Sequence, residues 1–310
     1  APQWTWFVLA GLTGGCGPNI GSVVRARWAD ALDAERRQTA FAFESVVDEV
    51  VFVVGPPLVT LLATLINPPV GFLTGVVLGF TGAMWLSGLR GTEPPVQPRD
   101  DANGPRTWVL LQPTVLVAVV YLGVGSVFGA MDVVVVAFAE AEGAPAMAGV
   151  ALAVYAGGSL VAGLLYGVVR VPGTLAARYV GCAVFFALAA QLLLVVGSLP
   201  MLVGAGFVAG LAIAPVLVSG TSLVESRAGR STLTEALTWG VTGLTLGVTA
   251  GSVVAGAAVD AWGAESAFAV PAVSAALAGL LALAGAPLLS GGSDSAPAAD
   301  RLRVEPPVGG

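Results

Sequence analysis

Long apolar stretches, separated by short polar connections, dominate the hydrophobicity pattern of this chain. A helix that crosses the hydrocarbon core of a bilayer needs about 20 consecutive, mostly apolar residues. Nine stretches have this length, and they cover residues 4–24, 42–66, 69–89, 113–138, 146–169, 177–198, 201–224, 233–258 and 266–289. The pattern therefore predicts an all-α membrane protein with nine transmembrane helices.

Polar segments divide these spans into two bundles. The longest connection, residues 90–112, is rich in proline and charge and separates three spans from six. The tail after Ser290 is rich in glycine, serine, proline and aspartate, a composition that stays disordered. We expect four parts: a partial N-terminal three-helix bundle at 1–90, a cytoplasmic inter-bundle loop at 91–112, a C-terminal six-helix bundle at 113–290 and a disordered cytoplasmic tail at 291–310.

Composition strengthens the membrane prediction and removes several kinds of chemistry. Only 10% of the residues are charged, whereas a soluble domain carries about 25%. The chain has no histidine, so the commonest proton shuttle and zinc ligand is missing. Cys16 and Cys182 stand alone in apolar runs and suit packing. We therefore expect no enzyme activity, no cofactor and no metal site.

Arginines occupy alternate connections between the spans. All 13 basic residues are arginines, and they follow the odd-numbered spans only. Because arginine-rich loops stay in the cytoplasm, this alternation predicts an external N-terminal end, a cytoplasmic C-terminus and a multi-pass protein of the plasma membrane. An odd number of spans with an external start is most simply explained by three further spans before Ala1, which would give six plus six.

Two short motifs are similar to elements of a transporter family. In the second span, Gly55-Pro56-Pro57 resembles the end of a Gly-x-x-x-Gly-Pro element, with Val51 at the first glycine. After the fifth span, the segment 163–167 followed by Arg170 resembles a Gly-x-x-x-Asp-Arg loop, with glycine at the aspartate. The first motif predicts a helix-packing role for Gly55, Pro56 and Pro57.

An internal repeat accompanies these motifs. The first two spans resemble the seventh and eighth, and the stretch from Val51 to Gly55 aligns with that from Gly247 to Gly251. Together, the layout, the motifs and the repeat resemble the major facilitator superfamily, here with nine of an expected twelve helices. The resemblance implies secondary active transport by alternating access between two bundles. Its implied partners are the lipid bilayer, a small-molecule substrate and protons, with no nucleic acid and a monomeric state.

Acidic residues inside spans are costly and therefore candidates for function. Glu44, Asp48 and Glu49 enter the second span from the predicted cytoplasmic side, and Glu44 and Asp48 share one helix face because they are four residues apart. They are candidates for proton coupling, with Asp48 the deepest. Asp132 and Glu235 are two further candidates for coupling or gating.

A structural alternative stays open for the acids of the second span. Arg25, Arg27, Arg36 and Arg37 lie at the same predicted membrane face. They could pair with these acids as a cytoplasmic latch when that side closes.

Polar and aromatic residues at helical spacing predict which faces line a cavity. On the fourth span, Tyr121, Phe128 and Asp132 share one face, and on the fifth Tyr155 and Ser159 do so. The eighth span carries a hydroxyl stripe made of Thr238, Thr242, Thr245 and Thr249. Helix packing is the alternative role for the stripe, since threonine can return its hydroxyl to its own helix.

These features favour a proton-coupled exporter of a small organic molecule, an antiporter. Two alternatives remain at this point: uptake of a sugar or metabolite, and a fragment without transport activity. An intramembrane enzyme would need a nucleophile and a base or a metal, and a channel would need a filter loop or charged rings. Neither set is found in the sequence.

Overall fold

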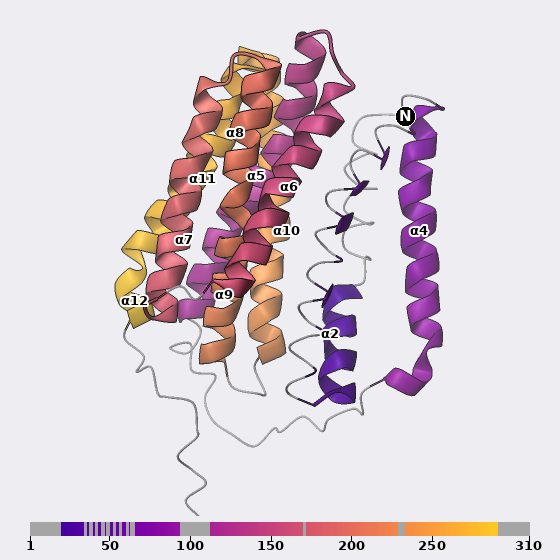
Figure 1. Cartoon of the computed structure of the whole chain (residues 1–310), viewed down its shortest axis with the longest axis vertical. Coiled ribbons are helices and arrows are strands. Elements are labelled where there is room, and N and C mark those ends of the chain that lie inside the picture. Colours follow the sequence, from indigo (N-terminus) through magenta and orange to yellow (C-terminus); the bar gives the residue numbers. More distant parts are fainter. Residues whose placement is uncertain are drawn as a thin grey trace, which may run out of the picture.

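The computed structural model describes residues 20–33, 66–93, 112–169, 172–228 and 233–290, together with scattered residues between 36 and 62. Every regular element in these residues is helical (Figure 1). The longer helices are α2 (Ile20–Ala31), α4 (Pro68–Gly88), α5 (Gln112–Ala141), α6 (Met147–Val168), α7 (Leu175–Ala190), α8 (Leu199–Leu211), α9 (Ile213–Arg227), α10 (Leu233–Trp262) and α11 (Ala269–Ala284). The short ones are η1 (Arg90–Thr92), η3 (Gln191–Val195), η4 (Ser266–Phe268) and α12 (Ala286–Ser290).

Seven helical segments in the described part are long and apolar enough to cross a membrane. They are Pro69–Gly88, Pro113–Ala141, Met147–Gly167, Leu175–Val195, Leu199–Arg227, Glu235–Trp262 and Ser266–Ala284. They coincide with the third to ninth predicted spans. The first two predicted spans, the inter-bundle loop and the tail lie largely or wholly outside the described residues.

Helix α2 corrects one predicted boundary. The sequence placed Arg25 and Arg27 in a connection after residue 24, but α2 continues to Ala31. Residues 25–31 contain three alanines and two arginines, which are among the strongest helix formers. An apolar window ends where the membrane ends, whereas a helix with these residues can continue into the interface.

The seventh predicted span is divided into α8 and α9 at Ala212. Pro215 explains the break, because its ring has no N–H to donate and clashes with the carbonyl four residues earlier, that of Leu211. Helix α8 ends at that residue. The sequence predicts one uninterrupted span here, so the structure adds a bend within it.

Two glycines end helices at the same end of the bundle. Gly143 follows α5 with φ 72°, and Gly263 follows α10 with φ 82°. This left-handed conformation suits glycine because it has no Cβ. After α5, the amide of Ala144 donates to the carbonyl of Ala139 at 2.9 Å, which closes the helix end and turns the chain into α6.

Glycines bring α5 and α10 into direct backbone contact. A Cβ atom at Gly243, Gly247 or Gly251 of α10 would lie 2.0–2.1 Å from a carbonyl oxygen of α5. A Cβ at Gly125 or Gly129 of α5 would lie 2.0 Å from a carbonyl oxygen of α10. We call these five residues the glycine seam. Small residues at a spacing of four let membrane helices approach this closely.

A second close contact joins α6 and α8. A Cβ at Gly158 would lie 2.4 Å from the carbonyl oxygen of Phe207, and one at Gly210 would lie 2.1 Å from that of Tyr155.

The α5–α10 contact and the α6–α8 contact are related by a repeat within the bundle. The six spans divide into a first half, α5–α7, and a second half, α8–α11. In this division α5 corresponds to α8/α9, α6 to α10 and α7 to α11. The contact of α5 with α10 then corresponds to that of α6 with α8/α9, and the contact of α5 with α11 to that of α7 with α9. The third pair, α7 and α11, contact each other. Because each half has three spans, the halves run in opposite directions, as in an inverted repeat.

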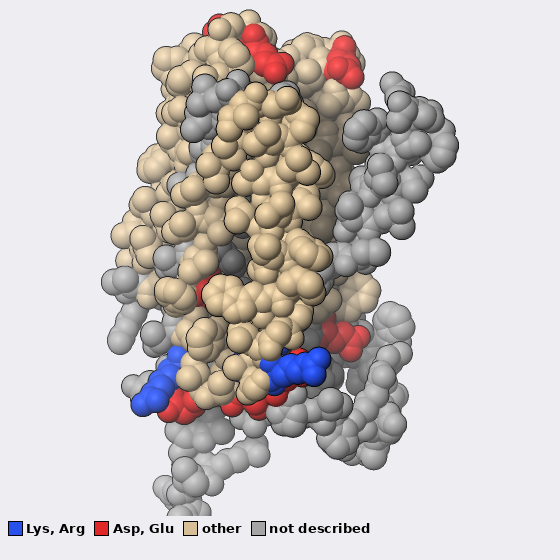
Figure 2. All heavy atoms as spheres, turned by 90° about the vertical axis from the view of Figure 1, so that its right-hand side faces the viewer, with Lys and Arg blue, Asp and Glu red and all other residues tan. Residues whose placement is uncertain are grey.

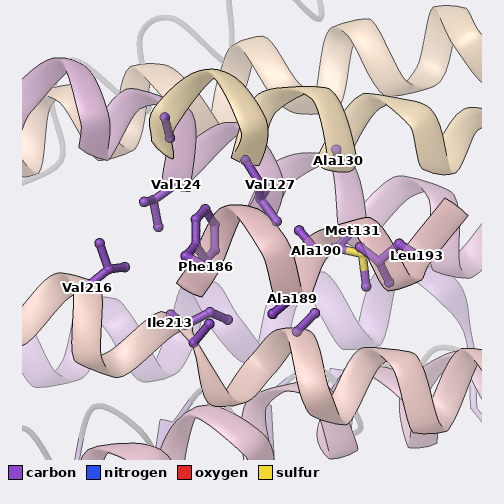
Figure 3. Packing of buried hydrophobic residues seen from close by; sticks show 14 of the residues in the cluster. Val124, Val127, Ala130, Met131, Phe186, Ala189, Ala190, Leu193, Ile213 and Val216 are labelled. Carbon is purple, nitrogen blue, oxygen red and sulfur yellow. The ribbon is translucent and has the colours of Figure 1, made fainter. Parts of the chain in front are cut away.

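Large apolar side chains from α5, α7 and α9 fill the centre of this six-span bundle (Figure 3). Met131, Phe186 and Ile213 are among the largest fully buried ones. Many apolar side chains point outward instead, such as Leu188 at 66% exposure and Val253 at 62%. An apolar outer surface of this extent suits lipid and not water. Helix α4 stands beside the bundle (Figure 1) with its apolar side chains almost entirely exposed.

Candidate functional site

Charged residues gather at the two ends of the bundle. Glu140, Glu142, Asp260 and Glu265 lie at the end where α5 meets α6 and α10 meets η4. We call this the acidic end. The arginines with described side chains lie at the opposite end, which we call the arginine end. Figure 2 shows basic side chains only at its lower end and acidic ones at both ends.

Asp132 is the only charged residue that lies well inside one of the seven described spans. It precedes the end of α5 at Ala141 by nine residues, which is roughly 14 Å of helix. The other charged residues of these spans lie within three residues of a helix end. The side chain of Asp132 is exposed, so its carboxyl group is accessible from outside the six-span bundle.

Phe128, Asp132 and Tyr155 come together between α5 and α6. The rings of Phe128 and Tyr155 meet edge to face, with centroids 6.2 Å apart. Asp132 lies one helical turn after Phe128, on the same face of α5. The Tyr155 side chain is only 5% exposed, and its hydroxyl has no hydrogen-bond partner in the described residues. The sequence predicts a cavity-lining role for these three residues, which come from two different spans, and the structure brings them together. We call them the Asp132 cluster.

Tyr121 and Ser159 are placed differently from the prediction. The sequence assigned both to a cavity, but they are buried in the bundle, with 6% and 4% exposure. The Tyr121 hydroxyl donates to the carbonyl of Leu217 and lies 3.2 Å from the hydroxyl of Thr221, both in α9. The Tyr121 ring fits over Gly220, where a Cβ would lie 2.6 Å from the Tyr121 hydroxyl. Tyr121 thus joins α5 to α9. Tyr121 and Asp132 have the spacing of one helix face, but along α5 this face changes from buried at Tyr121 to exposed at Asp132.

The hydroxyl stripe lies on an exposed face of α10, away from the glycine seam. Thr238, Thr242, Thr245 and Thr249 are all exposed, as is Glu235 near the start of the helix. Thr242, Thr245 and Thr249 each donate to the carbonyl four residues earlier, at 2.8, 2.9 and 3.2 Å. Their hydroxyls are therefore satisfied within the helix.

The acids and arginines of the predicted latch are described only in part. Glu44 is buried, with 8% exposure. Asp48, Glu49, Arg37 and the side chain of Arg25 lie outside the described residues.

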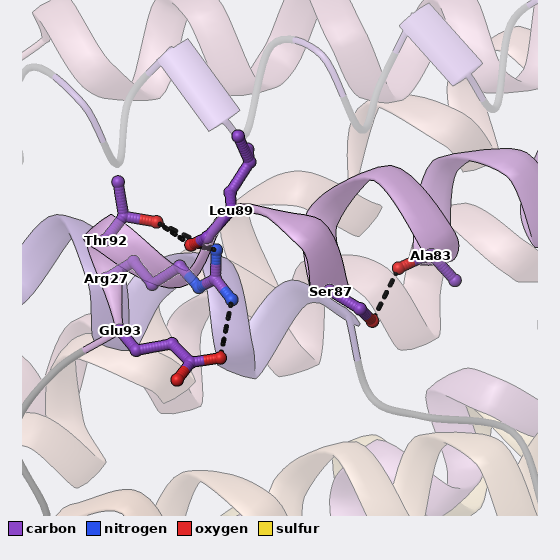
Figure 4. Close-up of polar contacts among 6 residues, drawn as sticks. All are labelled: Arg27, Ala83, Ser87, Leu89, Thr92 and Glu93. Atoms are coloured by element: carbon purple, nitrogen blue, oxygen red, sulfur yellow. Dashed lines mark hydrogen bonds and ion pairs between the residues drawn. The ribbon is translucent and has the colours of Figure 1, made fainter.

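The two latch arginines with described side chains contact other groups. The guanidinium group of Arg27 donates to the Leu89 carbonyl at 3.0 Å and to the Thr92 hydroxyl at 2.8 Å, and it lies 3.9 Å from the Glu93 carboxylate (Figure 4). Arg36 lies 3.8 Å from the carboxylate of Asp33. Arg27 thus ties α2 to the end of α4, a contact that the sequence did not predict.

Gly55 has no close neighbour among the described residues. None of their heavy atoms lies within 4 Å of the position that a Cβ would take there, and the helix-packing role of this residue stays a prediction. Pro56 and Pro57 lie outside the described residues. The aligned pair Gly247 and Gly251 belongs to the glycine seam, so the close contact is found in the second copy of the repeat.

Two polar links between helices were missed from the sequence. Gln191 donates to the carbonyl of Ala272 in α11 at 3.1 Å. Ser126 and Ser274 share a hydrogen bond of 2.9 Å between α5 and α11. An isolated polar residue in an apolar span was the signal for both, because such a residue needs a partner inside the membrane.

Replacing Tyr121 and Tyr155 by phenylalanine should show which of the two hydroxyls stabilises the fold through a hydrogen bond. Tyr121→Phe removes the bond to Leu217, so the free energy of unfolding should fall by about 1 kcal/mol. Tyr155→Phe removes a buried hydroxyl that has no partner in the described residues, so stability should be unchanged or rise by about 1 kcal/mol. Equilibrium unfolding of the detergent-purified variants would measure both. An equal loss in both variants would mean that the Tyr155 hydroxyl is hydrogen-bonded.

Comparison with protein-family models, with curated proteins and with solved structures gives no match for this chain. Within the described ranges, no group of three or more acidic, histidine or cysteine side chains could hold a metal ion. The Asp132 cluster is therefore the candidate site with the clearest chemistry. It offers one carboxyl group, two aromatic rings and one unsatisfied hydroxyl.

Proposed function

We propose that this chain acts as a secondary active transporter of the major facilitator type, which exports a small organic molecule in exchange for protons. The observation that carries the proposal is the paired arrangement of the six spans α5–α11. Inverted repeats of three helices are how many secondary transporters are built, and the substrate and coupling-ion sites of such transporters lie where the repeats meet.

The Asp132 cluster supports coupling to an ion. A carboxyl group inside a span is costly to keep and is retained where it binds an ion, a proton or a substrate. Asp132 is accessible in this conformation and lies beside Tyr155 and Phe128. The partly exposed ring of Phe128 offers an apolar surface to an organic molecule, while the carboxyl group takes up or releases a proton.

The N-terminal part of the proposed transporter has three spans. In this proposal, α4 packs with the first two predicted spans, and Glu44, Asp48 and Glu49 lie at its cytoplasmic side. The arginine end of the bundle faces the cytoplasm, in keeping with the positive-inside rule.

Cysteine labelling tests this orientation. In a variant with Cys16 and Cys182 replaced by alanine, a cysteine at Glu142 should react with a membrane-impermeant maleimide in intact cells. A cysteine at Ser226 should react only after the membrane is opened, because it lies at the arginine end. The opposite pattern would reverse the proposed orientation, and equal labelling in intact cells would contradict a membrane between the two positions.

Transport itself is tested with the purified full chain in liposomes. An acidic interior should drive the accumulation of ethidium, used as an amphipathic probe, and an uncoupler should abolish that accumulation. Counterflow of labelled glucose in the same liposomes would instead favour sugar uptake. Flux equal to that of protein-free liposomes for both probes would contradict transport by this chain.

A further inference from the structure

An apolar groove runs along the bundle surface between the second half of α6 and the bend that joins α8 to α9. It has a volume of about 260 Å³ and is lined by Ala162, Leu165, Tyr166, Val169, Leu211 and Pro215. The bend contributes directly, because Leu211 ends α8 and Pro215 is the residue that breaks the helix. The groove reaches the arginine end of the bundle, where Val169 directly follows α6.

A cation lies at this end of the groove. Cys182 of α7 contacts the hydroxyl of Tyr166 at 4.0 Å, and Arg178 is one helical turn before Cys182, nearer the start of α7. The spacing of four residues puts Arg178 on the same face of α7 as Cys182, the face that meets Tyr166. The Nε of Arg178 donates to the carbonyl of Gly173 at 3.1 Å.

The terminal nitrogens of Arg178 are available to a ligand. In the ranges that the structure describes, neither of them has a hydrogen-bond or carboxylate partner. Arg227 at the same end differs, because its guanidinium group donates to the carbonyl of Leu289 at 2.7 Å. An apolar surface within a membrane span thus lies next to an arginine at the membrane interface whose terminal N–H groups can still donate hydrogen bonds.

We propose that this groove binds an anionic phospholipid, with one acyl chain against the apolar lining and the phosphate at Arg178. The apolar lining matches a hydrocarbon chain and gives a water-soluble ligand almost nothing to bond. The guanidinium group matches a phosphate, since arginine donates to phosphate oxygens in a forked geometry. Basic positions between transmembrane helices bind anionic headgroups in this way. The site requires no transport activity.

Native mass spectrometry of the full chain in detergent tests the proposal. Phosphatidylglycerol and phosphatidylcholine with identical acyl chains are titrated separately, and inorganic phosphate is a third probe. We expect tighter binding of phosphatidylglycerol than of phosphatidylcholine and no binding of inorganic phosphate. Arg178→Gln should weaken phosphatidylglycerol binding about fivefold, as expected for the loss of one interfacial arginine.

Two matched controls separate this site from general membrane effects. Arg90→Gln removes the same charge from an exposed position after α4 and should leave lipid binding unchanged. Leu165→Trp fills the groove from a position that is 57% exposed and should weaken the binding of both lipids. Leu194→Trp, at 54% exposure in η3 directly after α7, should leave the binding of both lipids unchanged.

Three results would overturn the proposal: equal affinity for both lipids, equal effects of Arg178→Gln and Arg90→Gln, or no change in Leu165→Trp. Binding of inorganic phosphate as tight as that of phosphatidylglycerol would also reject a lipid and assign Arg178 to a free anion. Absence of phosphatidylglycerol binding by the unmodified chain would likewise overturn the proposal.

Discussion

Gly247→Ala is expected to destabilise the six-span bundle strongly. The new Cβ would lie 2.0 Å from the carbonyl oxygen of Leu122 and 2.9 Å from the amide nitrogen of Ser126. Both contacts are backbone, so no side chain can rotate away. The two helices would have to separate by more than an ångström, which would also open the contacts at Gly243 and Gly251. A loss of about 3 kcal/mol in unfolding free energy is expected.

Gly256→Ala provides the matched control. This glycine lies in the same helix, and no heavy atom lies within 4 Å of the position that the new methyl group would take. Alanine has the higher helix propensity, by roughly 1 kcal/mol, so this variant should be as stable as the original chain or slightly more stable. Equilibrium unfolding in detergent measures both variants. Similar stability of the two would mean that α5 and α10 do not touch along the glycine seam.

Asp132→Asn should abolish proton-driven accumulation of the transported probe while leaving the protein folded. An amide cannot take up and release a proton, so a coupled transporter would lose its driving force. Accumulation in liposomes with an acidic interior should fall to the level of protein-free liposomes, because the proton gradient no longer drives it. Flux of the probe down its own gradient should persist. A pH-sensitive dye inside the liposomes would report the proton movement directly.

Glu140→Gln is the control for this prediction. Glu140 lies in the same helix and is exposed, but it is at the acidic end, one residue before the end of α5. Its loss should leave accumulation close to that of the original chain. Full accumulation in Asp132→Asn would exclude Asp132 from coupling and would move attention to Glu44, Asp48 and Glu49.

Hydropathy alone predicted the helical class and the positions of the seven described spans. It could do so because the hydrocarbon core imposes one length and one composition on every crossing helix. The break at Ala212 was missed although Pro215 was visible in the sequence. A proline in a membrane span can be accommodated with or without a bend, so its effect depends on the neighbouring helices.

The faces of the helices were harder to predict than their positions. In a soluble protein the apolar side of a helix faces the core, but a membrane helix is apolar all round, so polarity does not separate core from lipid. Tyr121 and Asp132 share one face by spacing, yet one is buried and the other exposed. The more useful signal was small residues four apart, as in Gly243, Gly247 and Gly251, because only these allow two backbones to touch.

The threonines of α10 have a consequence for how that helix could move. Thr242, Thr245 and Thr249 donate their hydrogen bonds to carbonyl groups of their own helix. Because donor and acceptor belong to the same helix, these hydrogen bonds persist when the surroundings of the helix change from water to hydrocarbon or to another helix. The three hydroxyls can therefore be covered or uncovered without losing their hydrogen bonds, while the glycine seam on the other side of α10 holds the helix to α5.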